Sequence, residues 1–202
     1  MTDRENLYKG LSHAAWGYFF LNFDFNLGTV SIFPRFVGYL LFFHAIRRLS
    51  AERRDLLLLR PLCVLLGAWT AGDWLMSWGG GDIDGRILFL DLLAAAAGLY
   101  FQYQFLTDLA ALAETYRPAE DNDLAVRLRR RRTAYIVLVT AMSLLTTYPE
   151  RIMIRGDDWR TIFLLILAVT ACGVSLMIMA GLFELRKFFL PDTLEGGPGQ
   201  AH

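Results

Sequence analysis

The feature that most constrains this chain is the grouping of its apolar residues into long blocks, with the charged residues collected between them. Hydrophobic residues make up 55% of the chain, and its mean hydropathy is +0.37. A soluble domain contains about 45–50% apolar residues and interleaves polar ones through each element. A helix that crosses a bilayer needs about 20 consecutive apolar residues. The blocks therefore predict an all-α, polytopic membrane helix bundle.

Six membrane segments are expected, packed as a single transmembrane bundle over residues 1–190. Residues 191–202 are rich in glycine and are expected to form a flexible cytoplasmic tail. The fifth segment is expected to continue a helix that begins at an acidic capping cluster near residues 121–123. The six expected segments are residues 7–23, 34–49, 56–78, 85–116, 133–148 and 159–189.

The stretch between the first two segments mixes polar and apolar residues. Asn22, Asp24 and Asn26 alternate with apolar residues, which is typical of an extended strand with one polar face. Gly28 can turn the chain back, and Pro34 suits the first position of the next helix. Irregular backbone survives at membrane depth only where protein or a water-filled cavity surrounds it. We therefore expect a broken or hairpin-like turn that is partly embedded, and whether the two segments cross fully or re-enter stays open.

The same stretch carries a resemblance. An Asn/Asp-rich turn followed by the pattern Pro-x-Phe-x-Gly-Tyr at residues 34–39 resembles the amino-terminal part of small multi-spanning bacterial membrane proteins of uncharacterised activity. The resemblance covers only this part of the chain. It implies a bacterial membrane protein and no particular activity.

The basic residues predict the orientation. Most of the 20 Lys and Arg residues lie in the amino-terminal segment, in loops 47–60 and 117–132, and at the carboxyl end. Cytoplasmic loops carry such an excess, so we expect a bacterial cytoplasmic (inner) membrane with both termini cytoplasmic. The arginines predict contact with anionic lipid headgroups, and nucleic acid is not an expected partner. Asp108 is expected at or beyond the inner membrane interface. Whether the chain forms an oligomer or binds a membrane partner stays open.

Carboxylates at matched depth are the best candidate site. Asp73 lies five residues before Trp78, and Asp91 lies five residues after Arg86. Each is therefore expected roughly 7–8 Å inside the outer end of its helix, with Asp24 at a similar level. Ionisable groups within a span are costly and indicate function, here the binding of a cation or an amine, or a relay of protons. The alternative is that they pair with nearby arginines or favour a helix amino terminus.

A polar stripe extends this candidate site. Asp91, Ala95, Gly98 and Gln102 recur at helical spacing and predict one face of the fourth segment that leads inward. The alternative is that Gln102 forms an interhelical hydrogen bond, beside a close contact at Gly98. The predicted ligand-binding residues are Asp24, Asp73, Asp91, Gln102, Asn22 and Asn26.

The sequence predicts no catalytic residue, metal site or cofactor. His13 and His44 lack a supporting acid, and Cys63 and Cys172 lie within apolar blocks, as packing residues do. Two classes of function stay open. The first is a non-enzymatic membrane protein that binds or transports a small cationic or lipid-like solute in an outward-facing acidic cavity. The second is an intramembrane enzyme, or a regulatory or partner-binding subunit, that uses the same carboxylates or the arginine-rich face.

Overall fold

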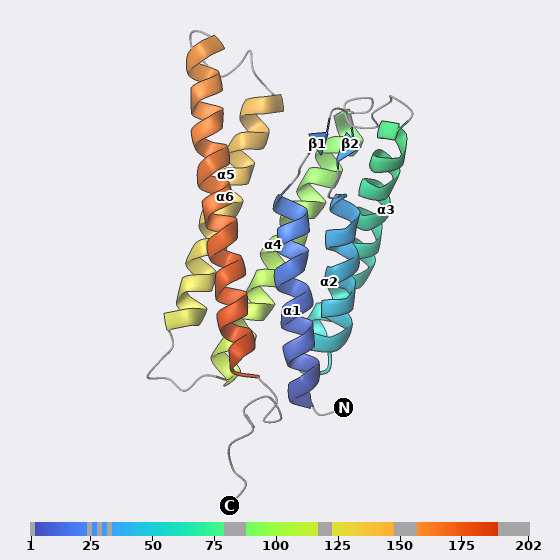
Figure 1. Cartoon of the computed structure of the whole chain (residues 1–202), viewed down its shortest axis with the longest axis vertical. Coiled ribbons are helices and arrows are strands. Elements are labelled where there is room, and N and C mark those ends of the chain that lie inside the picture. Colours follow the sequence, from blue (N-terminus) through green and yellow to red (C-terminus); the bar gives the residue numbers. More distant parts are fainter. Residues whose placement is uncertain are drawn as a thin grey trace, which may run out of the picture.

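The computed structural model describes residues 3–23, 26–27, 30–31, 34–78, 88–116, 123–147 and 157–189. Within them the chain forms six α-helices, with one short hairpin and one 3-10 helix, so the predicted helical class is confirmed (Figure 1). The elements are α1 (Asp3–Asn22), β1 (Asn26–Leu27), β2 (Val30–Ser31), α2 (Arg35–Leu49), η1 (Arg54–Leu58), α3 (Leu59–Trp78), α4 (Leu88–Tyr116), α5 (Asp123–Thr147) and α6 (Asp157–Lys187).

The turn between the first two helices is a hairpin, as the alternation of polar and apolar residues predicted. Strands β1 and β2 are antiparallel, and they pair Asn26 with Ser31 and Leu27 with Val30. Pro34 was predicted at the first position of the helix, but it is the N-cap of α2, with φ −67° and ψ 128°, and the helix begins at Arg35. The reason is that an N-cap residue has extended backbone, which the fixed φ of proline permits.

The third helix begins later than predicted. Residues 54–58 form the tighter helix η1, and α3 starts at Leu59 instead of residue 56. Pro61 is then the third residue of α3, where a backbone N–H has no partner within the helix, so proline costs no hydrogen bond. Just before η1, Nη2 of Arg53 donates to the carbonyl oxygen of Ala111 over 3.1 Å and holds this turn against α4.

Each helix packs against its neighbours in sequence, and α6 returns to pack against α1, so the six helices form a closed ring. Among these neighbouring pairs, α1 and α2 have the most extensive contact, whereas α3 and α4 have the sparsest. Two glycines allow the close approach of α1 and α2, because a Cβ atom on Gly38 would lie 3.0 Å from the carbonyl oxygen of Gly17. Small residues at helix contacts are typical of membrane bundles.

An aromatic cluster joins three helices in the core. The ring of Phe42 in α2 lies 5.2 Å from that of Tyr18 in α1, and 5.4 Å and 5.0 Å from those of Phe101 and Phe105 in α4, between ring centroids. These contacts are edge-to-face, which aromatic rings prefer. All four side chains are fully buried. The cluster therefore joins α1, α2 and α4 in the interior of the bundle.

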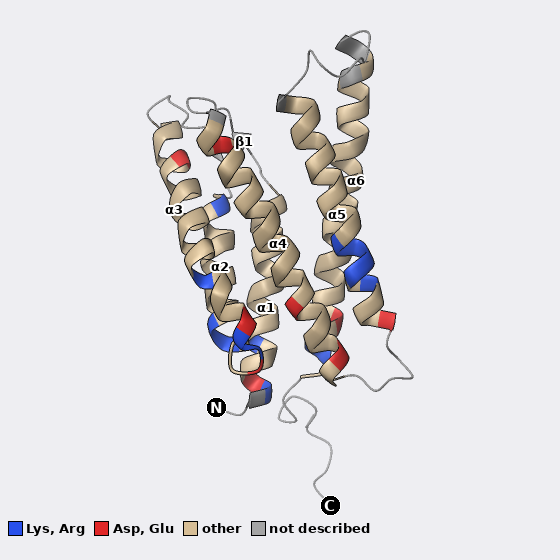
Figure 2. Cartoon of the chain, turned by 180° about the vertical axis from the view of Figure 1, so that it is seen from behind, with Lys and Arg blue, Asp and Glu red and all other residues tan. Residues whose placement is uncertain are grey.

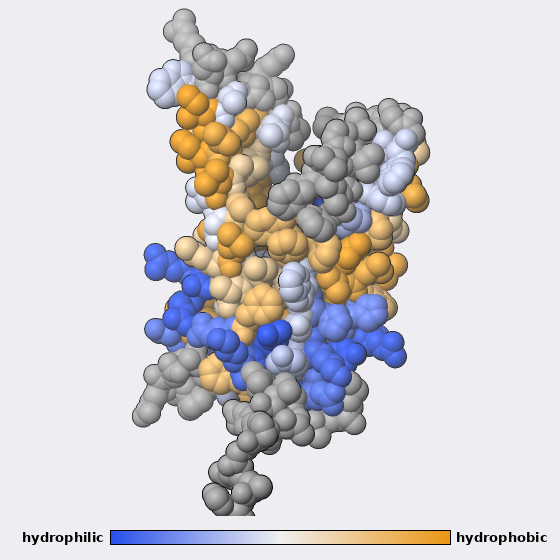
Figure 3. Space-filling model, viewed as in Figure 1, coloured by the Kyte–Doolittle hydropathy of each residue, from blue (hydrophilic) through white to orange (hydrophobic). Residues whose placement is uncertain are grey.

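The outer surface is apolar over much of its height. Figure 3 shows a belt of hydrophobic residues above a hydrophilic band. Two stretches, Arg54–Trp78 and Thr161–Lys187, are long and apolar enough to cross a membrane. Only 22% and 17% of the most apolar part of each stretch is buried inside the bundle. Their apolar side chains therefore face outward, unlike those of a core helix in a soluble protein. Two helices of the described chain thus support membrane association.

Basic residues gather at one end of the bundle (Figure 2). The arginine-rich start of α5 binds protein groups there: Arg127 pairs with Glu184 of α6 at 3.1 Å, and Arg129 pairs with Glu114 of α4 at 2.7 Å. Arg131 Nη1 donates to the carbonyl oxygen of Met177 over 2.7 Å. The sequence predicted only lipid contact for this segment, because a basic run alone does not reveal which helices lie beside it.

Candidate functional site: a buried polar cluster at the end of α1

A hydrogen bond between α1 and α5 is the centre of the candidate site. The hydroxyl of Tyr135 donates to Oδ1 of Asn22 over 2.7 Å, and Nδ2 of Asn22 donates to the carbonyl oxygen of Tyr18 over 2.9 Å. Asn22 is the last residue of α1, and Tyr135 is 5% exposed. A half-buried amide and a buried phenol therefore pair between two helices that are not neighbours in the ring.

Two further helices contribute polar side chains to the same place. Gln102 of α4 and Ser175 of α6 are 8% and 2% exposed, and both side chains lie near the Tyr135 hydroxyl. Ser175 Oγ also donates to the carbonyl oxygen of Ala171 over 2.9 Å. Four helices therefore converge on one buried polar cluster, which consists of Asn22, Gln102, Tyr135 and Ser175.

The polar cluster has acceptor capacity that the described protein groups do not use. Oε1 of Gln102 is buried, and it meets no hydrogen-bond donor within the described residues. The hydroxyl of the neighbouring Tyr18 is likewise buried without a partner there. A buried polar group left without a hydrogen bond costs about 1–3 kcal/mol. A ligand or water that donates to Gln102 would remove this cost.

The aromatic residue Tyr39 of α2 borders the cluster. A Cβ atom on Gly98 would lie 3.8 Å from the Tyr39 hydroxyl, and Gln102 is buried, so these two residues of α4 face the interior of the bundle. Ala95, predicted on the same stripe, is exposed. Cys63 Sγ donates to the carbonyl oxygen of Tyr39 over 3.1 Å, and both cysteines are free, which agrees with the predicted packing role.

The polar cluster lies where the bundle begins to open. Above the end of α1, the α5–α6 pair stands apart from the other helices (Figures 1 and 2). Figure 3 shows the surface hollowed between them. Asn22 ends α1 at this level, so the cluster lies at the base of the hollow.

The predicted carboxylates lie at this open end. Asp91 is in the first turn of α4 and Asp73 lies five residues before the end of α3, and both are half-buried. Because α3 and α4 are consecutive, antiparallel neighbours, the two residues share one end of the bundle, as expected. Arg35 starts α2 at the same end. Of the other predicted site residues, Asp24 and the side chain of Asn26 lie outside the described residues.

The sequence did not indicate Tyr135 and Ser175 as site residues. Both lie within apolar blocks, where an aromatic or a small hydroxyl side chain usually indicates a packing residue. Their position against Asn22 and Gln102 depends on how α5 and α6 are rotated. The sequence offered one indication, a tyrosine inside an apolar block, because a buried phenol needs a hydrogen-bond partner.

Metal chemistry finds no support in the described part of the chain. No group of three or more His, Cys, Asp or Glu side chains there is arranged to hold a metal ion. The rings of His13 and His44 stack with centroids 6.0 Å apart, and each Nδ1 bonds a carbonyl oxygen of its own helix.

Comparison with known proteins leaves the chain without an assigned relative. No protein-family model, no curated protein and no solved structure matches it.

Proposed function

We propose that the chain is a multi-pass protein of a bacterial inner membrane that binds a small amine-bearing solute, cationic or lipid-like, in the hollow above the polar cluster. Both termini are cytoplasmic in this proposal, and the hollow opens to the other side. Binding or transport, not catalysis, is the proposed activity. The reason is that the cluster consists of amides and hydroxyls, which are weak nucleophiles without an adjacent base.

Two features support the membrane placement. Large apolar side chains are exposed on several helices, among them Leu92 and Leu93 of α4 and Leu165 of α6. Lys and Arg are concentrated at the end where both termini lie (Figure 2), which is the cytoplasmic signature. The other connections contain only Arg35, Arg86, Arg151, Arg155 and Arg160.

The observation that carries the binding proposal is the buried Oε1 of Gln102, beside the Tyr135–Asn22 hydrogen bond at the base of the hollow. An oxygen acceptor in a low-dielectric site prefers a donor, and a charged donor forms the stronger bond. Asp73 and Asp91 at the open end of the bundle add negative charge, which favours a cation over a neutral solute. An ammonium group meets both requirements.

Thermal unfolding of the purified protein in detergent tests this proposal. Ethanolamine is the probe, and 1-propanol, which has the same length but no ammonium group, is the matched control. We expect ethanolamine, but not 1-propanol, to raise the unfolding temperature until it saturates. Gln102→Leu is expected to abolish the shift, and Asp73→Asn and Asp91→Asn are expected to weaken the apparent affinity at least about tenfold, the factor for about 1.4 kcal/mol.

Tyr100→Phe is the control variant, because Tyr100 is 59% exposed on α4, and it is expected to respond like the wild type. Circular dichroism confirms that each variant is helical before titration. A wild-type protein that ethanolamine does not stabilise contradicts the proposal. So does an unchanged response in all three site variants.

A further inference from the structure

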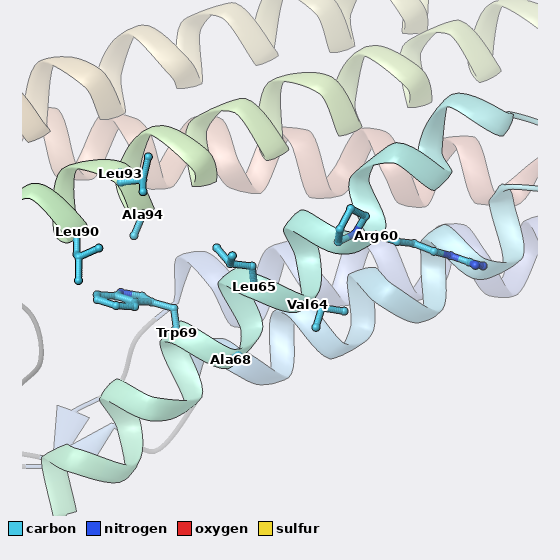
Figure 4. A pocket seen from close by; sticks show the side chains of 9 residues that line it. Arg60, Val64, Leu65, Ala68, Trp69, Leu90, Leu93 and Ala94 are labelled. Carbon is cyan, nitrogen blue, oxygen red and sulfur yellow. The ribbon is translucent and has the colours of Figure 1, made fainter.

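A large apolar groove runs between α3 and α4, away from the polar cluster. Its volume is about 960 Å³. Figure 4 shows Leu65 and Trp69 of α3 facing Leu90 and Ala94 of α4 across it. The groove exists because α3 and α4 have the sparsest contact of the neighbouring helix pairs. Its walls include Val64 and Leu65, which are 56% and 59% exposed.

One end of the groove carries a positive charge. Arg60, in the first turn of α3, lines the groove and extends from its end (Figure 4). The Nε atom of Arg60 is buried and has no hydrogen-bond acceptor among the described residues. The guanidinium carbon lies 6.0 Å from the centroid of the Phe43 ring. An apolar channel that ends in a guanidinium group is complementary to an amphipathic anion.

We propose that this groove binds one acyl chain of an anionic phospholipid, with the lipid phosphate bound by Arg60. Trp69 lies nine positions after Arg60 in the helix, which corresponds to about 13–14 Å of groove, within the reach of an acyl chain. Arg60 belongs to the arginine-rich end of the bundle, where the proposed topology puts the cytoplasmic headgroups. The site rests on the proposed membrane placement, but it is independent of the solute site.

A lipid fits the groove better than a protein helix does. In a bilayer an apolar side chain gains little by leaving lipid for protein, so apolar surface alone does not select a partner. The distinguishing feature is the guanidinium group, which forms charge-assisted hydrogen bonds with phosphate. The groove therefore selects a lipid by its headgroup, and an anionic lipid is preferred over a zwitterionic one.

Fluorescence quenching of Trp69 by brominated lipids tests the site. Trp69 lines the groove, and replacing Trp16, Trp74, Trp78 and Trp159 with Phe leaves it as the single tryptophan. The protein is reconstituted into phosphatidylcholine vesicles that contain either brominated phosphatidylglycerol or brominated phosphatidylcholine. We expect phosphatidylglycerol to bind near Trp69 about fivefold more strongly, the factor that corresponds to about 1 kcal/mol per basic residue.

Arg60→Ala is expected to abolish this preference, and Arg60→Lys to retain part of it. Arg130→Ala is the matched control, because Arg130 is an exposed arginine of α5 that does not line the groove, and it should keep the preference. Equal quenching by the two lipids in the wild type, or an unchanged preference in Arg60→Ala, overturns the lipid site alone. An absence of quenching by either lipid overturns the membrane placement as well.

Discussion

The hydroxyl of Tyr135 donates a hydrogen bond over 2.7 Å to Oδ1 of Asn22, and this bond joins α5 to α1 through residues that are 113 positions apart in sequence. The Tyr135 side chain is buried and that of Asn22 is half-buried, so the phenol cannot exchange its partner for solvent at low cost. The bond therefore holds α5 at the end of α1, at the level where the α5–α6 pair diverges from the rest of the bundle.

Tyr135→Phe is expected to lower the free energy of unfolding by about 0.5–1.5 kcal/mol, because it removes the hydrogen bond to the half-buried Oδ1 of Asn22. Thermal or denaturant unfolding in detergent measures the loss. Tyr100→Phe removes an exposed hydroxyl from α4 and should change stability by less than about 0.5 kcal/mol. In a double-mutant cycle with Asn22→Ala, additive losses would show that the bond contributes nothing.

Gly38→Ala is expected to lower the free energy of unfolding by about 1–3 kcal/mol, because the added methyl group would lie 3.0 Å from the carbonyl oxygen of Gly17 and push α1 and α2 apart. Gly173→Ala is the matched control. A Cβ atom on Gly173 meets nothing within 4 Å, so this change should be neutral or stabilising by up to about 1 kcal/mol. Equal effects of the two substitutions would argue against a tight α1–α2 contact.

Asp108, at the arginine-rich end of α4 beyond the proposed membrane span, predicts a dependence of stability on pH. Burial raises the pKa of this carboxyl group, and the side chain of Gln104, which donates to it over 3.2 Å, opposes the rise. Because the pKa is higher in the folded state than in the unfolded state, ionisation of Asp108 lowers the free energy of unfolding. The loss begins near the unfolded pKa, about 3.9, and is complete above the folded pKa.

Asp108→Asn is therefore expected to raise the unfolding temperature at pH 8, and the gain should shrink toward zero as the pH falls to about 4. Unfolding temperatures over this range, recorded for both proteins, measure the effect. Asp123→Asn, at an exposed position in the first turn of α5, should show no such gain. A gain from Asp108→Asn that does not vary with pH would contradict the assignment to ionisation.

The proposed orientation predicts which cysteine substitutions react with a membrane-impermeant maleimide in intact cells. In a Cys63→Ala, Cys172→Ala background, Trp159→Cys in the first turn of α6 should be labelled from outside the cell. Glu52→Cys, in the exposed turn before η1, should react only after the membrane is opened. The reverse pattern would invert the topology, and it would put the hollow on the cytoplasmic side.

Local features of the chain were readable from the sequence. The apolar blocks predicted six helices whose bounds agree to within a few residues, because a helix satisfies its backbone internally. The exception is the start of α5, which the capping cluster near residues 121–123 predicted and the apolar block did not. The alternation of polar and apolar residues after Asn22 predicted the hairpin, since that period of two matches a strand. The shared end of Asp73 and Asp91 followed from the short connection between α3 and α4.

Only the tertiary structure decided which side chains meet. The pairing of Tyr135 with Asn22 and the approach of Ser175 and Gln102 to Tyr135 depend on how each helix is rotated and how closely it approaches its neighbours. The same holds for the groove that α3 forms with α4. Those quantities are set by packing among residues far apart in sequence, such as Gly17 against Gly38, and a one-dimensional pattern does not encode them. The sequence by itself therefore determined the helices and their charged end, whereas the structure determined the candidate sites.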